Sequence, residues 1–131
     1  MLKIAYKEIY QHPLPERHRF PMIKYELIPN QLLYEGIISN ENLFEPNDCS
    51  EENILLTHDY NYWKNLNQLK LTESEMRKIG FPLSAKLVAR EITIMQGTID
   101  CALYTLQFGF AMNTAGGTLH AFTNKGEGFS Y

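Results

Sequence analysis

The longest regular pattern in the sequence begins at Ser84. Beyond it, apolar residues recur at steps of three and four positions, which is the spacing of one face of an α-helix. They are Leu87, Val88, Ile92, Met95, Ile99, Leu103 and Leu106. Ser84 is a suitable amino-terminal cap for this segment. The sequence therefore predicts a helix over residues 84–107.

Short apolar segments elsewhere are typical of strands. Residues 110–113 follow Gly109 and are largely apolar, as expected of a buried parallel strand. Residues 2–6 favour a first strand near a sheet edge, and residues 54–56 favour a short buried strand. Strands separated by helices predict an α/β layered domain, in which functional residues gather at the carboxyl ends of the strands.

Prolines, glycines and caps divide the rest of the chain. Residues 12–21 contain three prolines and predict an ordered loop. A helix follows from Pro21 to Gly36, in which Pro29 is expected to cause a kink or a split. After a polar connection over residues 40–50, we expect helices over residues 60–69, with Tyr60 and Trp63 in the core, and from the capping box Thr72–Glu75 to Gly80.

Composition excludes several classes of protein. The chain has 131 residues, of which 44% are hydrophobic and 21% charged, so it can form a core and is not a disordered segment. Its formal net charge of −3 argues against a sequence-independent nucleic-acid binder. We expect no membrane span and no secretory signal, and therefore a cytoplasmic protein. Cys49 and Cys101 are not in CxxC spacing, and both are expected to be reduced thiols.

The segment after Asn113 carries the residues best suited to chemistry. Gly116 and Gly117 allow a sharp turn directly after a buried strand, and His120 follows at the rim of the sheet. A histidine in such a loop can act as a general base, although an exposed polar histidine with no catalytic role is the more common case. The glycines lack the lysine of a phosphate-binding loop and the spacing of a dinucleotide fingerprint, which argues against nucleotide binding.

A series of motifs in fixed order resembles one known family. The motifs are Asn113-Thr114-Ala115-Gly116-Gly117-Thr118-Leu119-His120-Ala121-Phe122, Gly126-Glu127-Gly128-Phe129, His12-Pro13-Leu14-Pro15, His18-Arg19-Phe20-Pro21-Met22, His58-Asp59, Ile79-Gly80-Phe81-Pro82 and Gly97-Thr98. Together they resemble zinc-dependent deacetylases of the histone deacetylase and acetoin-utilisation superfamily, and a bacterial member in particular. The resemblance implies an α/β fold of the arginase/deacetylase type, with three αβα layers and a mainly parallel sheet, of which this chain is an incomplete first half.

The resemblance also implies roles for four residues. His120 matches the second of two adjacent family histidines, the general acid/base toward the metal-bound water and the leaving amine. Gly128 and Phe129 match the pair that lines the acyl-lysine tunnel, where the phenyl ring stacks on the aliphatic part of the substrate. Arg19 matches an arginine near the internal acetate channel, with a loop cation paired to Glu16 or to water as the alternative.

The remaining histidines are not expected to bind a metal. The spacing of His12, His18 and His58 does not support a metal cluster, because loop or helix separates each from the others, and the resemblance gives them structural or rim positions. Asp59 is expected to interact with free backbone N–H groups at the start of a helix.

Two departures from the family pattern affect the expected activity. Leu119 occupies the position of the first family histidine, whose hydrogen bond to the reacting oxygen is typically worth about a hundred- to a thousandfold in rate. The family's zinc ligands, an Asp and a His one residue apart and a later Asp, come after the position of Tyr131. We therefore interpret residues 1–131 as the amino-terminal part of one deacetylase-like domain. We expect this part alone to contain no metal ligand and to bind no zinc.

The expected function is that of the complete domain. The complete domain would bind zinc and hydrolyse the acetyl-amide bond of an acetylated small molecule or of a protein lysine, whereas residues 1–131 alone would be inactive. The alternative is a catalytically inactive remnant or interaction module, which Leu119 favours. We expect the chain to form a homo-oligomer or to associate with the remainder of its own domain.

Overall fold

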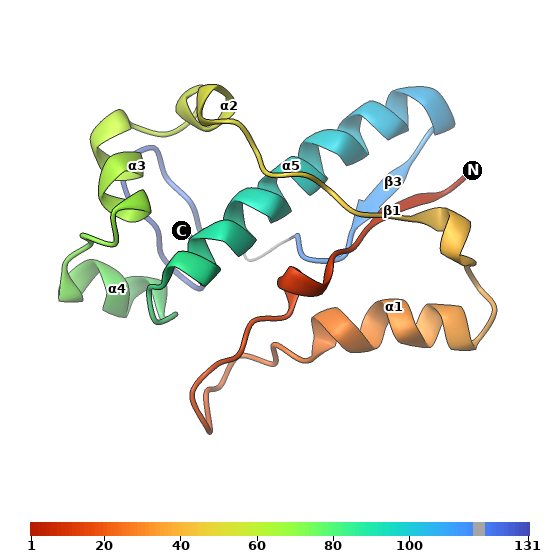
Figure 1. Ribbon diagram of the computed structural model, residues 1–131, viewed down its shortest axis with the longest axis horizontal. Helices are drawn as coiled ribbons and strands as arrows, with labels where there is room; N and C mark the ends of the chain where they lie inside the picture. The colour runs from red at the N-terminus through yellow and green to blue at the C-terminus, as the bar shows by residue number, and fades with distance from the viewer. Residues whose placement is uncertain (117–119) are drawn as a thin grey trace. The chain divides into compact units, whose positions relative to one another are not determined.

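The computed structural model describes residues 1–116 and 120–131. Within it the chain divides into two compact units, each built from two segments. Unit 1 comprises Met1–Asp48 and Thr93–Gly116, and unit 2 comprises Cys49–Ile92 and Gly117–Tyr131. The long helix α5, Ala85–Phe108, begins in unit 2 and ends in unit 1 (Figure 1). Its observed bounds confirm the helix predicted over residues 84–107, and the Ser84 hydroxyl accepts a hydrogen bond from the Leu87 amide at 3.1 Å.

Unit 1 contains a parallel sheet of three strands in the order β2-β1-β3. The strands are β1, Lys3–Ala5, β2, Leu43–Phe44, and β3, Ala111–Asn113. Ile4 pairs in register with Leu43 on one side and with Met112 on the other. The strands expected over residues 2–6 and 110–113 are confirmed. The expected edge position of the first strand is wrong, because β1 is the central strand of this sheet.

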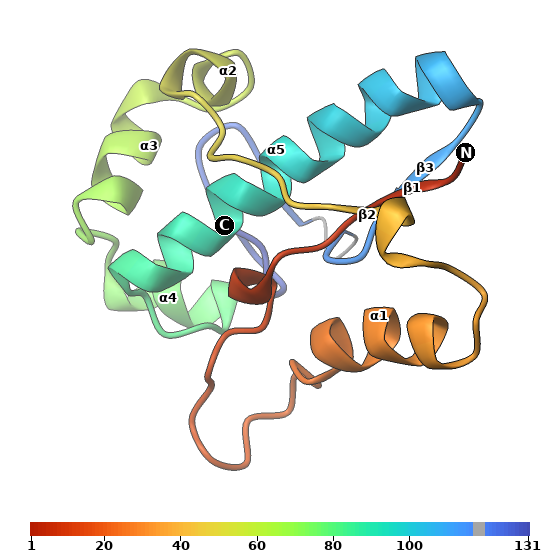
Figure 2. The same cartoon turned by 45° about the vertical axis from the view of Figure 1, so that its right-hand side comes forward.

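Helices cover both faces of this sheet. Helix α1, Lys24–Tyr34, and the second half of α5 lie on opposite sides of the strands (Figures 1 and 2). The three layers confirm the predicted α/β class. Pro29 does not split α1, which continues through it with the proline buried. The short 3₁₀ helices Glu8–Tyr10 and Asn40–Asn42 complete unit 1.

One strand was not foreseen. β2 lies in the stretch expected to be a polar connection, and it has only two residues. Its neighbours explain why it forms: the Tyr6 amide donates to the Phe44 carbonyl at 3.0 Å, and the Phe44 ring lies 4.8 Å from that of Tyr104 on α5. Tertiary contacts, and not local propensity, define this strand.

Gly97 allows α5 to approach the strand ends closely. The Asn113 amide nitrogen donates to the carbonyl oxygen of Ile94 at 2.9 Å and to the hydroxyl of Thr98 at 3.1 Å. A Cβ atom at position 97 would lie 2.8 Å from that amide nitrogen and closer still to the Tyr10 hydroxyl. The end of β3 is therefore fixed against α5 at Gly97, where the helix has no side chain in the way.

Unit 2 is built of short helices around a small core. They are α2, Glu51–Leu55, α3, Tyr60–Asn67, α4, Glu73–Ile79, and the first turns of α5. Its most buried apolar side chains are Ile54, Tyr62, Trp63, Leu66, Leu71, Ile79, Phe81, Leu87 and Val88. Trp63 is buried as predicted, but Tyr60 is 56% exposed, so its expected core position is wrong.

Caps explain why these helices begin where they do. Asp59 accepts hydrogen bonds from the amides of Asn61 and Tyr62 at 2.9 and 3.1 Å, which confirms its predicted role. Thr72 and Glu75 form the predicted capping box, and these hydrogen bonds from Thr72 lower the pKa of Glu75. The strand expected over residues 54–56 is wrong, because Ser50 caps α2 and the apolar residues continue that helix.

The first prediction concerns Gly97→Ala. Alanine is favoured over glycine in a helix by about 1 kcal/mol, but an added methyl group here would overlap Tyr10 and Asn113, and overpacking costs about 1–3 kcal/mol. We expect a lower free energy of unfolding by urea denaturation. Adding Tyr10→Phe, which removes the nearest atom, should recover part of the loss. A Gly97→Ala variant more stable than the parent chain would contradict the close packing.

The second prediction concerns the core of unit 2 at high pH. Burial, followed by the charges of Glu75 and Glu91, raises the pKa of Tyr62 to about 12, from a usual value near 10. Because the folded-state pKa is the higher one, this stabilising contribution is complete below pH 10 and is lost as the pH rises toward 12. Between pH 8 and pH 11 the free energy of unfolding of the parent chain should therefore fall by about 1 kcal/mol more than that of Tyr62→Phe.

Tyr34→Phe is the matched control for this experiment, since the Tyr34 side chain is 87% exposed. Among the described residues the buried Tyr62 hydroxyl has no hydrogen-bond partner, so Tyr62→Phe should itself change the stability by no more than about 1 kcal/mol at pH 8. Equal losses of stability between pH 8 and pH 11 in the parent chain and in Tyr62→Phe would contradict the prediction.

Candidate functional site

Residues 120–127 form a short hairpin in unit 2. Ala121 and Gly126 form an antiparallel bridge, and the Glu127 amide donates to the His120 carbonyl at 3.1 Å. A Cβ atom at Gly126 would overlap the carbonyl oxygen of Ser130, so only glycine allows the two backbone segments to lie this close. The hairpin thus places His120 beside the residues that follow Gly126.

Residues 127–130 form a tight turn directly after the hairpin. The Ser130 amide donates to the Glu127 carbonyl at 3.1 Å, and Gly128 and Phe129 have φ values of 58° and 66°. Two positive φ values at the central positions are typical of a type I′ turn. Glycine adopts this conformation freely, whereas for phenylalanine it costs about 1–2 kcal/mol. The surrounding contacts must therefore hold Phe129 in place.

The carboxyl end of α4 supplies those contacts. The Gly128 amide donates to the Lys78 carbonyl at 3.0 Å, and the Phe129 amide donates to the Ile79 carbonyl at 2.6 Å. The Phe129 ring packs on that of Phe81, with 5.1 Å between the ring centroids, and against Gly80. Carbonyls in the last turn of a helix lack partners within the helix, and here the turn satisfies two of them.

The His120 ring lies against the backbone of Gly128. A Cβ atom at Gly128 would be 2.9 Å from Cγ and 3.0 Å from Cδ2 of the imidazole. The His120 side chain is exposed, and Phe129 is partly exposed. Three of the four residues predicted from the sequence, His120, Gly128 and Phe129, therefore come together at one place in unit 2.

The same hairpin carries a charged pair and an aromatic ring that were not among the residues predicted for the site. Lys125 Nζ lies 3.0 Å from the Glu127 carboxylate and 4.4 Å from the centroid of the Phe122 ring. The hydrogen bond from Lys125 lowers the pKa of Glu127, and the positive charges of Lys125, Lys78 and His120 act in the same direction. The two glycines in Gly126-Glu127-Gly128 could have indicated this pair, because glycines that permit a hairpin also bring the polar residues of the hairpin close together.

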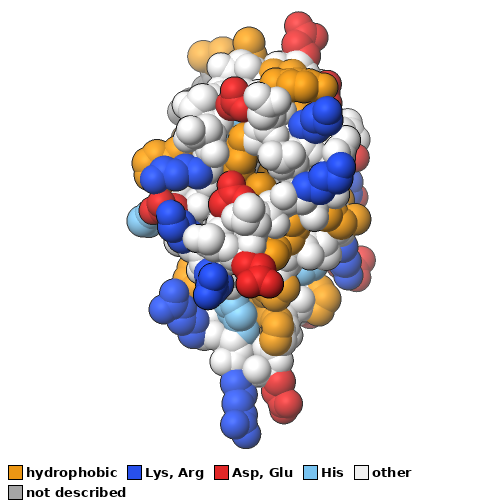
Figure 3. Space-filling view, turned by 90° about the vertical axis from the view of Figure 1, so that its left-hand side faces the viewer, with side chains coloured by type: hydrophobic (Ala, Val, Ile, Leu, Met, Phe, Trp, Pro, Cys, Tyr) orange, Lys and Arg blue, Asp and Glu red, His pale blue; other side chains and the backbone are white. Residues whose placement is uncertain are grey.

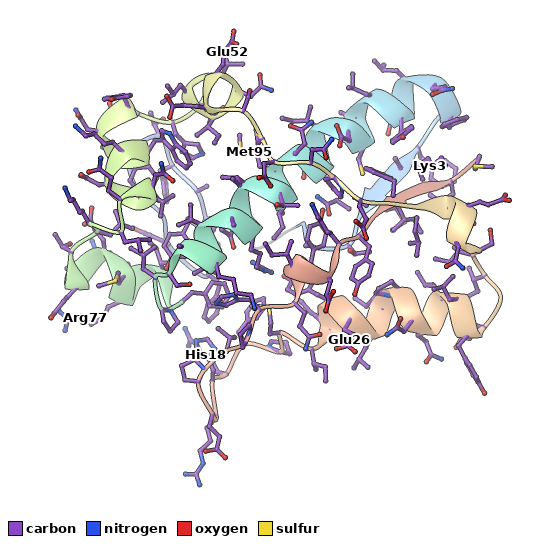
Figure 4. The ribbon with its side chains drawn as sticks, viewed as in Figure 1. Lys3, His18, Glu26, Glu52, Arg77 and Met95 are labelled. Atoms are coloured by element: carbon purple, nitrogen blue, oxygen red, sulfur yellow. The ribbon has the colours of Figure 1, made fainter. Side chains whose placement is uncertain are left out.

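Two hydrogen bonds fix the hairpin to the start of α3. The Asp59 amide donates to the Thr123 carbonyl at 2.8 Å, and His58 Nδ1 lies 3.0 Å from the Phe122 carbonyl oxygen. His58 therefore contacts the backbone of the hairpin. On the face over α3 and α4, acidic and basic side chains are interspersed (Figure 3), and Arg77 of α4 points outward (Figure 4).

Arg19 is described with unit 1. It is exposed in the loop between His12 and Pro21, where the Phe20 amide donates to His18 Nδ1 at 3.1 Å (Figure 4). Arg19 therefore belongs to a different unit from His120, Gly128 and Phe129. Leu119 lies outside the described residues.

Neither a metal-binding group nor a membrane-spanning helix is present in the described part of the chain. Residues 1–116 and 120–131 contain no cluster of three or more His, Cys, Asp or Glu side chains that could hold a metal ion. Over the same residues, each helix is too short or too polar to cross a membrane. The exposed imidazole of His120 can transfer a proton, and the nearby ring of Phe129 can contact an apolar chain.

The third prediction tests the contact between Gly128 and His120. In Gly128→Ala the new methyl group would meet the imidazole, and the positive φ would cost about 1–2 kcal/mol. We expect displaced ring-proton resonances of His120 by NMR and a lower unfolding free energy. Gly116→Ala is the control, because a methyl group there makes only an ordinary contact, 3.6 Å from the Asn113 carbonyl. Unchanged His120 resonances in Gly128→Ala would show that the two residues are not in contact.

Known structures share the fold of this chain. A crystal structure of an HDAC homologue from Aquifex aeolicus matches it with a TM-score of 0.77 at 21% sequence identity. One of an HDAC homologue complexed with SAHA matches with a TM-score of 0.80 at 22% identity. Each match covers 99% of this chain and 38% of the other chain.

Sequence comparison identifies the family. An uncharacterized protein of Picosynechococcus sp. is 41% identical over 126 residues, which are 96% of this chain and 42% of the relative. The chain thus spans about two fifths of the length of the proteins it matches. The family model of the histone deacetylase domain matches residues 18–131. The chain belongs to the histone deacetylase domain family.

Proposed function

We propose that this chain supplies the proton-transfer and substrate-contacting part of a deacetylase that hydrolyses acetyl-amide bonds. The substrate would be an acetylated small molecule or a protein lysine. The observation that carries the proposal is the contact of the His120 imidazole with Gly128, next to Phe129. The hairpin and the turn that follows it thus hold the imidazole against the residue that precedes Phe129.

In this proposal each residue has a separate task. His120 exchanges a proton with the reacting group and with the leaving amine. Phe129 contacts the aliphatic part of the substrate, and its positive φ fixes the direction of the ring. Gly128 leaves room for the imidazole. Arg19, in unit 1, is proposed to favour the anionic acetate product.

The metal of the family does not fit the described residues of this chain. Zinc in a catalytic site takes three protein ligands, and the described residues provide no such set. Zinc is therefore assigned to other parts of a complete domain. The longer relatives, in which this chain corresponds to about two fifths of the length, are consistent with such a division.

A second proposal, a catalytically inactive module, is favoured by one sequence observation. Leu119 cannot donate the hydrogen bond that the resemblance assigns to the first histidine. Loss of one such donor typically lowers the rate by about a hundred- to a thousandfold.

The fourth prediction separates the two proposals. The chain is co-expressed with the part of the Picosynechococcus relative beyond the matched segment, and hydrolysis of an acetyl-lysine peptide is measured with added zinc. We expect activity that falls by about a hundredfold or more in His120→Asn. In the control His18→Asn an amide oxygen can still accept the Phe20 N–H, so activity should be unchanged.

The remaining outcomes are equally informative. A purified complex without activity that gains it in Leu119→His would favour the inactive module. Robust hydrolysis by the 131-residue chain alone would overturn the assignment of zinc to other parts of the domain. Full activity of His120→Asn would overturn the role of His120.

A further inference from the structure

The hairpin at residues 120–127 places His120 opposite Glu127. Its antiparallel bridge joins Ala121 and Gly126. His120 and Glu127 are the next residues outward on the two strands, and the Glu127 amide donates to the His120 carbonyl at 3.1 Å. Side chains at directly opposite positions of an antiparallel pair lie on the same face and close enough to interact. The Glu127 carboxylate is therefore on the same face of the hairpin as the His120 imidazole.

The same alternation places Lys125 and Phe122 on this face. They form the pair on the other side of the bridge, where the Phe122 amide donates to the Lys125 carbonyl at 3.0 Å. Lys125 Nζ lies 4.4 Å from the centroid of the Phe122 ring and 3.0 Å from the Glu127 carboxylate, so these three side chains do share a face. An aromatic ring, an ammonium group, a carboxylate and an imidazole thus follow one another along the hairpin.

Glycines flank Glu127 on both sides for steric reasons. A Cβ atom at Gly126 would overlap a backbone carbonyl oxygen, and one at Gly128 would lie 2.9 Å from Cγ of the His120 imidazole. Side chains are therefore excluded at both positions. The segment that supports the imidazole, residues 126–128, carries a single charge, the carboxylate of Glu127.

Glu127 stays ionised over the pH range in which histidines normally titrate. The hydrogen bond and the charge of Lys125, followed by the charges of Lys78 and His120, lower the pKa of Glu127. A permanent negative charge favours the protonated form of an imidazole on the same face. The ammonium group of Lys125 acts in the opposite sense, because it pairs with the carboxylate and repels an imidazolium.

Charged and titratable groups of two helices also face the hairpin. Lys78, in the last turn of α4, adds a positive charge near Glu127. At the start of α3, His58 Nδ1 lies 3.0 Å from the Phe122 carbonyl oxygen, and the Asp59 carboxylate accepts two amides of its own helix. These groups are the same in the parent chain and in the variants below, so they form a constant background.

We infer that Glu127 is a positioning residue for the proton of His120, and that Lys125 sets how strongly the Glu127 carboxylate acts. The carboxylate favours the imidazolium, which gives its proton to the nitrogen of the leaving amine and becomes a neutral imidazole. Lys125 weakens this effect by pairing with the carboxylate. This role rests on the proposed proton transfer by His120, and Glu127 acts through the imidazole without touching the substrate.

The substitution Glu127→Gln separates the charge of this residue from its structural contacts. The backbone of Glu127 holds the hairpin and the turn together, because its amide donates to His120 and its carbonyl accepts the Ser130 amide at 3.1 Å. Glutamine keeps both backbone bonds, and its amide oxygen can still accept a hydrogen bond from Lys125. A purely structural role of Glu127 would therefore survive this substitution.

The fifth prediction follows the titration of the His120 ring protons by NMR in the 131-residue chain, with neither metal nor substrate. In Glu127→Gln we expect the midpoint to fall by about 0.2–0.7 pH units, as the loss of one cross-strand pair of opposite charges implies. Lys125→Gln should raise the midpoint, because the carboxylate then acts unpaired. Glu127→Asp, which retains the charge, should stay near the parent value. Sodium chloride at about 1 M should reduce all these differences.

Glu52→Gln is the matched control, because it removes the same charge from an exposed side chain that points outward from α2 in the same unit (Figure 4). Its midpoint should equal that of the parent chain. An unchanged midpoint in Glu127→Gln, or an equal fall in Glu52→Gln, would overturn the role of Glu127.

The pH profile of hydrolysis is then measured in the co-expressed complex of the fourth prediction, and it should move in the same direction as the midpoint. A titration that moves while the pH profile of an active complex does not would also overturn this role. The titration itself needs no activity. Failure of the proposed function, seen as full activity of His120→Asn, is therefore distinguishable from failure of the role of Glu127.

Discussion

The close approach of α5 to the strand ends of unit 1 is the constraint that fixes where the chain leaves β3. Asn113 ends β3 and bonds to the helix backbone at Ile94, beside Gly97. The next residue, Thr114, bonds with both its amide and its hydroxyl to the Ala5 carbonyl, at 3.1 and 2.9 Å. The segment that leads to His120 therefore departs from a point held by the helix and the central strand together.

In unit 2, the last carbonyls of α4, which lack partners within the helix, hold the turn at residues 127–130 in place. Gly80 ends α4 in the left-handed conformation, with φ at 88°, which leaves the carbonyls of Lys78 and Ile79 available. They accept the amides of Gly128 and Phe129, and these two bonds offset the strain of a phenylalanine at positive φ. The orientation of the Phe129 ring is thus set by where a helix stops. This explains why Ile79-Gly80-Phe81-Pro82 and Gly126-Glu127-Gly128-Phe129, almost fifty residues apart, act as one structural element.

Local signals in the sequence predicted the features that depend on neighbouring residues. The helical periodicity after Ser84, the capping box at Thr72 and the cap at Asp59 were all confirmed, because each rests on residues two to four positions apart. Features that depend on distant residues could not be predicted in the same way. β2 exists through its pairing with β1, and the exposure of Tyr60 reflects which side of α3 meets the core. For the site, the motifs named His120, Gly128 and Phe129, but the Lys125–Glu127 pair required the hairpin itself.

Two independent observations support the proposal that a larger domain completes the chemistry of this chain. The first is chemical: the described residues place an acid/base imidazole beside an aromatic ring but provide no set of metal ligands. The second is physical: Leu103 and Leu106 in the second half of α5 are 61% and 86% exposed, although Thr93 to Phe108 contain a single charged residue, Asp100. Loss of catalysis alone would explain missing ligands, but it would not preserve an apolar face that is costly to expose. An exposed apolar face, together with described residues that provide no set of metal ligands, therefore supports the proposal that other parts of a domain supply both the cover and the metal.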